Sequence, residues 1–161
     1  MPSVIEGNFN FAGNVAFASV SLPSLCIANA NVAAAAAIDA SKLVHLHIKS
    51  DGQKNGTANV AERKVLHIVR GATGTLKAFK CRNTTAASSS DKTSVQLKKN
   101  GSNILSAAID LDATASTTTQ SGSFSGTSVV AGDVLEFDAS LTGTSVGQGL
   151  VCQLEIEETY S

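Results

Sequence analysis

The sequence predicts an all-β fold, an antiparallel β-sandwich of the jelly-roll type with about eight strands and an extended N-terminal arm. Three observations predict it. Short segments alternate apolar and polar residues, which is typical of strands with one buried and one solvated face. Runs of Gly, Asn, Ser and Thr separate these segments, as in sandwiches and barrels. The chain has 161 residues, enough for one domain whose core needs no metal or disulfide.

Residues 1–41 are predicted to form the extended arm, and residues 42–161 the sandwich domain. The arm has no clean alternation, although Phe9, Phe11 and Phe17 supply three of the six phenylalanines. Exposed phenylalanines are costly in a free monomer, so we predict that these three residues contact another chain. An arm folded back over its own sandwich is the alternative.

The first predicted strands follow the arm. Residues 43–49 and 65–70 are rich in Val, Ile and Leu, and the polar loop 50–63 lies between them. Residues 75–82 are predicted to form the next strand. Its alternation breaks near Ala78, where we expect a β-bulge.

A hairpin is predicted in the middle of the chain. Residues 95–98 and 105–112 alternate, and Asn100-Gly101 stands between them. This dipeptide is a strong signal for a type I′ turn, because both central residues of that turn need positive φ.

The C-terminal part contains the clearest strands. The Ser- and Thr-rich run 113–128 is expected to be a long surface loop, and a weaker strand is predicted over 124–130. Strict alternation over 133–141 and 150–157 predicts two half-buried strands. The Gly-, Ser- and Thr-rich residues 142–149 between them favour a hairpin with a long loop.

Charge is segregated along the chain. Residues 1–41 carry two acids and no base, for a net charge of −2, and residues 42–99 carry all 12 Lys and Arg against three acids, for +9. Residues 100–161 carry eight acids and no base, for −8. Two interpretations stay open: the basic and acidic parts neutralise each other within one fold or between subunits, or the basic part binds an acidic partner.

Composition excludes several classes of protein. The net charge of −1 argues against a nucleic-acid partner. The longest apolar run, residues 32–38, falls far short of the ~20 residues that span a bilayer, so we expect no membrane segment and no signal peptide. Cys26, Cys81 and Cys152 are widely spaced and form no CxxC motif, which favours synthesis in a reducing cytoplasm.

Three histidines could in principle hold a metal. His45 and His47 lie two apart on one predicted strand, so their rings share a face, and His67 lies on a possible neighbouring strand. His-x-His also opens the cupin metal motif, but Glu62 stands in a loop and does not complete it. Partly exposed strand histidines are the simpler interpretation, so we predict no metal and no cofactor.

Two carboxylate pairs raise the possibility of a glycosidase. Asp110 and Asp112 face one way, as do Glu136 and Asp138. Sugar sites usually offer flat aromatic rings, however, and this chain has no Trp and only Tyr160. We therefore predict solvated strand faces and no enzyme activity.

Five segments carry a resemblance to known proteins: Ala35–His47, which is alanine-rich and reads AAAIDASKLVHLH, His67–Thr75, Val95–Ser106, Val130–Phe137 and Gly149–Glu157. As a set they resemble structural proteins of tailed phages and related proteins encoded in bacterial genomes. Together they span about residues 35–158.

The resemblance implies a virion component of the class of capsid decoration (cement) proteins. Such a protein sits on the outside of the head, typically as a homotrimer, and clamps the major capsid protein. It implies no catalytic residues. On this hypothesis Phe9, Phe11 and Phe17 reach the capsid lattice or a sister subunit. A head-fibre or tail-fibre module is the alternative, and a cupin-like metal enzyme is a distant one.

Overall fold

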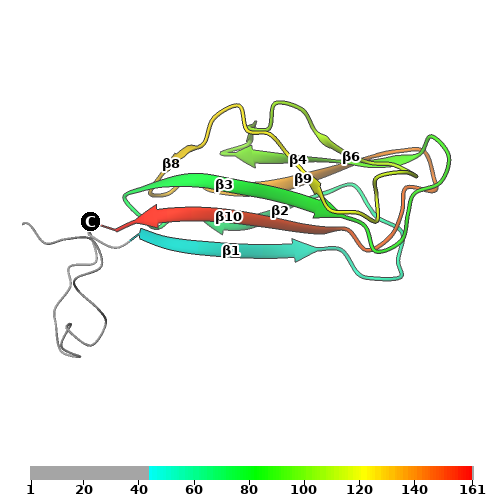
Figure 1. Ribbon diagram of the computed structural model, residues 1–161, viewed down its shortest axis with the longest axis horizontal. Coiled ribbons are helices and arrows are strands. Elements are labelled where there is room, and N and C mark those ends of the chain that lie inside the picture. Colours follow the sequence, from blue (N-terminus) through cyan, green and yellow to red (C-terminus); the bar gives the residue numbers. More distant parts are fainter. Residues whose placement is uncertain (1–43, 161) are drawn as a thin grey trace, which may run out of the picture. The chain divides into compact units, whose positions relative to one another are not determined.

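A computed structural model describes residues 44–160, and these residues form ten β-strands. The strands build two five-stranded sheets in which every pair is antiparallel (Figure 1). The predicted all-β sandwich is thereby confirmed. Within the described residues, no helix is long and apolar enough to cross a membrane.

The first sheet has the order β1-β10-β3. It contains β1 (Val44–Gly52), β10 (Val151–Thr159) and β3 (Thr73–Arg82), and the far edge of β3 pairs with the short strands β7 (Gln120–Ser121) and β8 (Ser128–Val130). β1 therefore forms one edge of this sheet.

The second sheet has the order β2-β9-β4. It contains β2 (Glu62–Ile68), β9 (Val134–Thr142) and β4 (Lys92–Lys99), and β4 also pairs with β5 (Ser102–Asn103) and β6 (Ile109–Leu111). β1, β2, β3 and β4 alternate between the sheets, and β9 and β10 do so again. This alternation of strands between two packed sheets is the jelly-roll arrangement.

The core lies between the two sheets and follows the predicted inner faces. Phe137 on β9 and Phe79 on β3 are fully buried, as are the leucines around them. Cys81 and Cys152 are free thiols opposite each other on β3 and β10, with their Sγ atoms 3.3 Å apart. Both thiols are buried and act as small hydrophobic residues of the core, and burial raises the pKa of the Cys81 thiol.

Some details of the prediction were wrong. Residues 133–141 and 150–157 do not form a hairpin, because β9 and β10 lie in different sheets and their connection crosses from one sheet to the other. The run 113–128 is not only a loop, since it contains β7 and the first residue of β8. The predicted strand 105–112 is reduced to β6, and the short strands β5 and β7, which were not predicted, bring the total from about eight to ten.

Two local predictions were close. Asn100 and Gly101 have φ values of 51° and 82° and connect β4 to β5, as a type I′ turn requires. The expected bulge in β3 lies next to Ala78: Glu155 is opposite Ala78 and Ile156 is opposite Leu76, so Lys77 is the extra residue.

One side of the sandwich is sealed by backbone hydrogen bonds between the two sheets. The Ser106 amide donates to the Ser123 carbonyl at 2.8 Å, and the Ser125 amide donates to the Ile104 carbonyl at 2.9 Å. We call this rim, made of β5, β6, β7, β8 and the segments 104–106 and 123–125, the sealed side.

Candidate functional site

The opposite rim lies between β1 and β2, and we call it the open side. Among the described residues, β1 pairs only with β10 and β2 only with β9, so each strand has one unpaired edge. β1 presents nine residues on this edge and β2 seven. Backbone N–H and C=O groups on such long edges are available to another chain.

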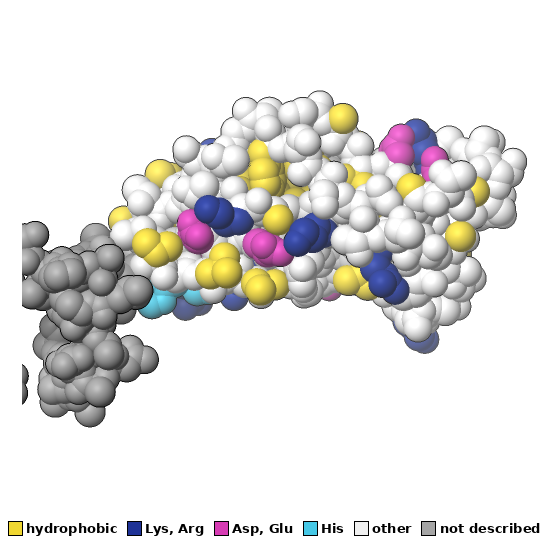
Figure 2. Space-filling view, in the orientation of Figure 1, with side chains coloured by type: hydrophobic (Ala, Val, Ile, Leu, Met, Phe, Trp, Pro, Cys, Tyr) yellow, Lys and Arg dark blue, Asp and Glu magenta, His cyan; other side chains and the backbone are white. Residues whose placement is uncertain are grey.

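The outer face of β1 is apolar and exposed. Val44, Leu46 and Ile48 are 63%, 58% and 57% exposed. Figure 2 looks onto this face of the sheet: hydrophobic side chains gather along the rim over β1, and charged side chains lie over β10 and β3. The alternation of β1 therefore has the reverse of the usual orientation: its apolar residues face outward, and its polar residues face the second sheet. We call this the inverted alternation of β1.

The inward residues of β1 bring the three histidines together. His45 and His47 stack with ring centroids 6.4 Å apart, and the ring of His67 on β2 lies 5.8 Å from that of His47. His45 meets the Tyr160 ring edge-on at 5.1 Å. The sequence correctly predicted that His45 and His47 share a face, and the sandwich places His67 across from them.

Glu158 is the buried charge of this histidine cluster. Its side chain is fully buried on β10, where it hydrogen bonds to Nε2 of His67. It also accepts hydrogen bonds from the backbone amides of Gly71 at 2.6 Å and Arg70 at 3.0 Å. Burial alone would raise the pKa of Glu158, but these three hydrogen bonds outweigh it and lower the pKa.

A groove of about 520 Å³ opens beside the histidine cluster. His47, Lys49, His67, Arg70 and Tyr160 supply its polar lining, and Val65, Leu66 and Ile68 of β2 supply its apolar wall. Within residues 44–160, Lys49 and Arg70 form no ion pair. The Tyr160 hydroxyl is 3.4 Å from both His47 Nε2 and Glu158 Oε2. The groove therefore offers cations and an apolar wall side by side.

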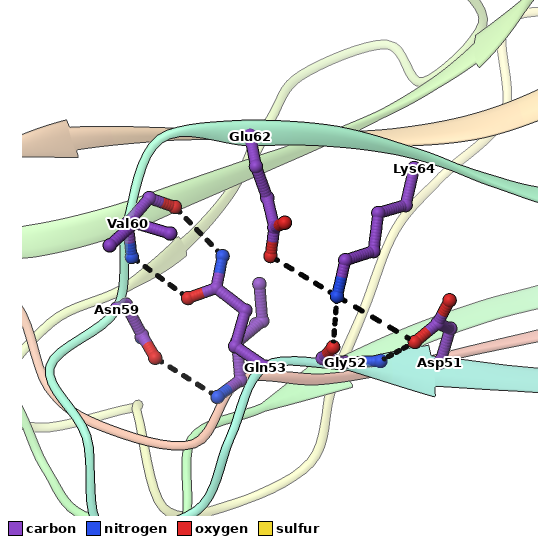
Figure 3. Close-up of polar contacts among 8 residues, drawn as sticks. Asp51, Gly52, Gln53, Asn59, Val60, Glu62 and Lys64 are labelled. Carbon is purple, nitrogen blue, oxygen red and sulfur yellow. Dashed lines mark hydrogen bonds and ion pairs between the residues drawn. The ribbon is translucent and has the colours of Figure 1, made fainter.

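A lysine connects β1 to β2 at the other end of the open side. Lys64 Nζ donates to the Gly52 carbonyl at 2.5 Å and lies 3.4 Å from Glu62 and 3.9 Å from Asp51 (Figure 3). Beyond it, the Gln53 side chain hydrogen bonds to both the amide and the carbonyl of Val60, at 2.8 and 2.7 Å (Figure 3). These contacts, which we call the lysine clasp, hold the two edge strands together away from the groove.

The segregated charges meet as ion pairs within the fold. Lys77 and Lys80 on β3 pair with Glu157 and Glu155 on β10, at 3.1 and 2.9 Å. Further pairs between the middle and the end of the chain are Arg63–Asp138, Lys92–Asp110, Lys98–Asp138 and Lys99–Asp133. Neutralisation within one fold therefore accounts for most of the described charge, and the cations of the groove are an exception to it.

The other candidate residues of the sequence are the three phenylalanines and the two carboxylate pairs. Phe9, Phe11 and Phe17 lie outside the described residues. Asp110 contacts Lys92 and Ser94, and Asp138 contacts Arg63 and Lys98. No three His, Cys, Asp or Glu side chains among residues 44–160 are placed to hold one metal ion, so the histidine cluster lends no support to the cupin alternative.

Sequence reasoning missed several residues of the open side, among them Glu158, Arg70 and Tyr160. Glu158 stands among Glu155 and Glu157, and only the alternation of β10 distinguishes it, because it falls on the inner face after Cys152, Leu154 and Ile156. Arg70 and Tyr160 carry no local signal. They reach the groove because β2 and β10 end at the same end of the sandwich, next to the start of β1 (Figure 1).

Comparisons with known proteins add no identification: no family model matches the chain, and no curated protein matches it either.

Proposed function

We propose that this chain is a structural protein of a tailed-phage virion, a decoration or cement protein that binds the outer surface of the head and stabilises the lattice of the major capsid protein. One observation carries the proposal: β1 is a nine-residue edge strand whose outer edge has no strand partner among residues 44–160 and whose outer face is apolar and exposed. Soluble sandwiches usually protect such edges, because a bare edge pairs readily with another chain. The resemblance over residues 35–158 supplies the class of partner.

The proposed protein works by docking and not by catalysis. The ionised groups of the open side are engaged in structural contacts, as with Glu158 and Lys64, or line a groove that opens to solvent, as with Lys49 and Arg70. We place the protein on the outer capsid surface as a homotrimer, synthesised in the host cytoplasm, with no cofactor. Symmetric association would cover part of the apolar surface of β1.

Binding to particles tests this function. Purified full-length protein is mixed with phage heads that lack it, the heads are sedimented, and the copies bound per head are counted by quantitative mass spectrometry. A decoration protein saturates at hundreds of copies and raises the temperature at which the heads disrupt. Saturation at a few copies would assign the chain to a fibre, and no binding would overturn the proposal.

The predicted arm is tested in the same assay. We expect deletion of residues 1–20, which removes Phe9, Phe11 and Phe17, to lower occupancy on the heads. Circular dichroism and the thermal melting of the variant show whether the sandwich is intact. Unchanged occupancy of a folded variant would refute the anchoring role of the three phenylalanines.

A further inference from the structure

We propose that the open side binds an extended acidic segment of a partner protein, which adds to the free edge of β1 as a new strand and places its carboxylates in the cationic groove. This inference deepens the proposed function, on which it rests only for the identity of the partner. The recognition chemistry itself follows from the described residues.

The backbone of β1 supplies the first part of the argument. Its nine residues pair with β10 along one edge, in regular register from Val44 opposite Thr159 to Gly52 opposite Val151. The other edge has no strand partner among residues 44–160. Addition of a strand to such an edge is a common way to bind an extended peptide, because the main chain supplies hydrogen bonds and alternate side chains supply specificity.

The side chains of β1 define what the added strand would carry. Side chains on neighbouring strands share a face, so residues beside Val44, Leu46 and Ile48 would point outward and meet an apolar surface. The alternate residues would point inward, toward His47 and Lys49 and the groove. The inverted alternation of β1 therefore predicts a segment of alternating apolar and anionic residues.

Charge supplies the third part of the argument. The one carboxylate within the histidine cluster, Glu158, is buried and already accepts hydrogen bonds from His67, Tyr160 and the backbone amides of Arg70 and Gly71. Asp51 and Glu62, farther along the open side, face Lys64. The groove thus presents Lys49 and Arg70 with no ion-pair partner in the described chain, although most lysines on the outer faces of the sheets have one. An anionic partner would form ion pairs with these two side chains, whereas a cationic partner would be repelled by them.

An NMR titration tests the proposal on the full-length chain. The probe is an acetylated and amidated seven-residue peptide that alternates Val and Glu, and the comparison peptide has Lys in place of each Glu. We expect saturable binding of the Glu peptide, with the largest amide shifts in residues 44–52, and weakening as NaCl is raised from 50 to 500 mM. A Glu peptide N-methylated at alternate amides, which cannot donate those hydrogen bonds, should lose binding.

Substitutions of the groove cations test whether the carboxylates of the Glu peptide bind in the groove. Arg70→Gln and Lys49→Gln should each raise the Kd by roughly 1.5- to 5-fold, as expected for the loss of one cross-strand charge pair. Arg82→Gln is the matched control, because Arg82 lies at the other end of β3, outside the groove, and also has no ion pair within residues 44–160. Equal weakening by all three variants would overturn the assignment.

Other results would also overturn the proposal. They are an absence of saturable binding, equal binding of the Lys peptide, and shifts confined to the sealed side. Self-association of the chain through β1 that the Glu peptide does not displace would assign the edge to a second copy instead. The titration uses no phage particles, so its result is independent of the proposed function. The Glu peptide can fail to bind although the protein decorates heads, and it can bind although the protein does not decorate heads.

Discussion

The two sides of the sandwich differ in how much of the backbone at the edges of the sheets is left without a strand partner. On the sealed side, strands of two or three residues and the hydrogen bonds between segments 104–106 and 123–125 leave little free backbone. On the open side, the outer edges of the nine-residue β1 and the seven-residue β2 have no strand partner among residues 44–160, and the space between the two strands holds histidines, Glu158 and Lys64 beside the apolar wall of β2. We expect stability to reside mainly on the sealed side and in the central core, and we propose that the open side is where a partner binds.

The largest expected contrast is between one leucine on each side. Leu105 is 4% exposed, and a Cβ on Gly122 would lie 2.9 Å from its methyl groups, whereas Leu46 is 58% exposed. We expect Leu105→Ala to lower the free energy of unfolding by about 2–5 kcal/mol through the cavity it leaves. Leu46→Ala should change it by no more than about 0.5 kcal/mol. Urea denaturation followed by circular dichroism measures both, and equal losses would remove the distinction between the two sides.

The next contrast concerns one carboxylate from each side. Glu158→Gln removes the charge that accepts four hydrogen bonds in a buried site, and we expect the free energy of unfolding to fall by about 1–3 kcal/mol. Asp110→Asn on β6 removes an exposed partner of Lys92, which should cost no more than about 1 kcal/mol. If Asp110→Asn lowers the free energy of unfolding as much as Glu158→Gln does, burial does not determine how much these carboxylates contribute to stability.

The same carboxylate predicts a pH dependence. The pKa of Glu158 is lower in the folded chain than its ordinary value of 4.5, so its contribution to stability is present above pH 4.5 and is lost as the pH falls through the folded pKa. The free energy of unfolding should therefore fall below pH 4.5, and less steeply in Glu158→Gln. Because the pKa values of Asp110, Asp112 and Asp133 are also lowered, the variant should keep part of the dependence. Identical pH profiles would contradict the role assigned to Glu158.

The smallest expected effect comes from the lysine clasp. Lys64→Met keeps the aliphatic stem but removes the donor to the Gly52 carbonyl and the pairs with Glu62 and Asp51. We expect a loss of about 0.5–1 kcal/mol in global stability, together with faster hydrogen exchange confined to β1 and β2. Lys77→Gln, which breaks one exposed pair with Glu157, is the matched control and should leave that exchange unchanged.

Alternation predicted most of the fold, because one buried face per strand is a local property of the sequence. It placed Leu135, Phe137, Leu154 and Ile156 correctly in the core. It could not assign strands to sheets, so β9 and β10 were joined in a hairpin although they lie in different sheets. Strand pairing depends on contacts between distant parts of the chain, which periodicity does not encode.

The open side was harder to predict for a related reason. Alternation in β1 marks two faces but does not say which one turns inward, and at this edge the polar face does. Buried polar residues were missed in the same way. Asn59 belongs to a segment with the composition of a loop, yet it is 3% exposed and donates hydrogen bonds to the side chains of Asn83 and Thr93, at 2.9 and 3.0 Å.

The most direct test of the account is whether particle binding depends on the open side. We would introduce Leu46→Asp with Ile48→Asp on β1 and, as a matched control, Val130→Asp on β8, where Val130 is 53% exposed. Each protein is first shown to be folded and is then sedimented with phage heads that lack it. The account predicts that the β1 variant loses most of its occupancy while Val130→Asp binds like the unmodified protein. Full occupancy by the β1 variant, or an equal loss by Val130→Asp, would contradict it.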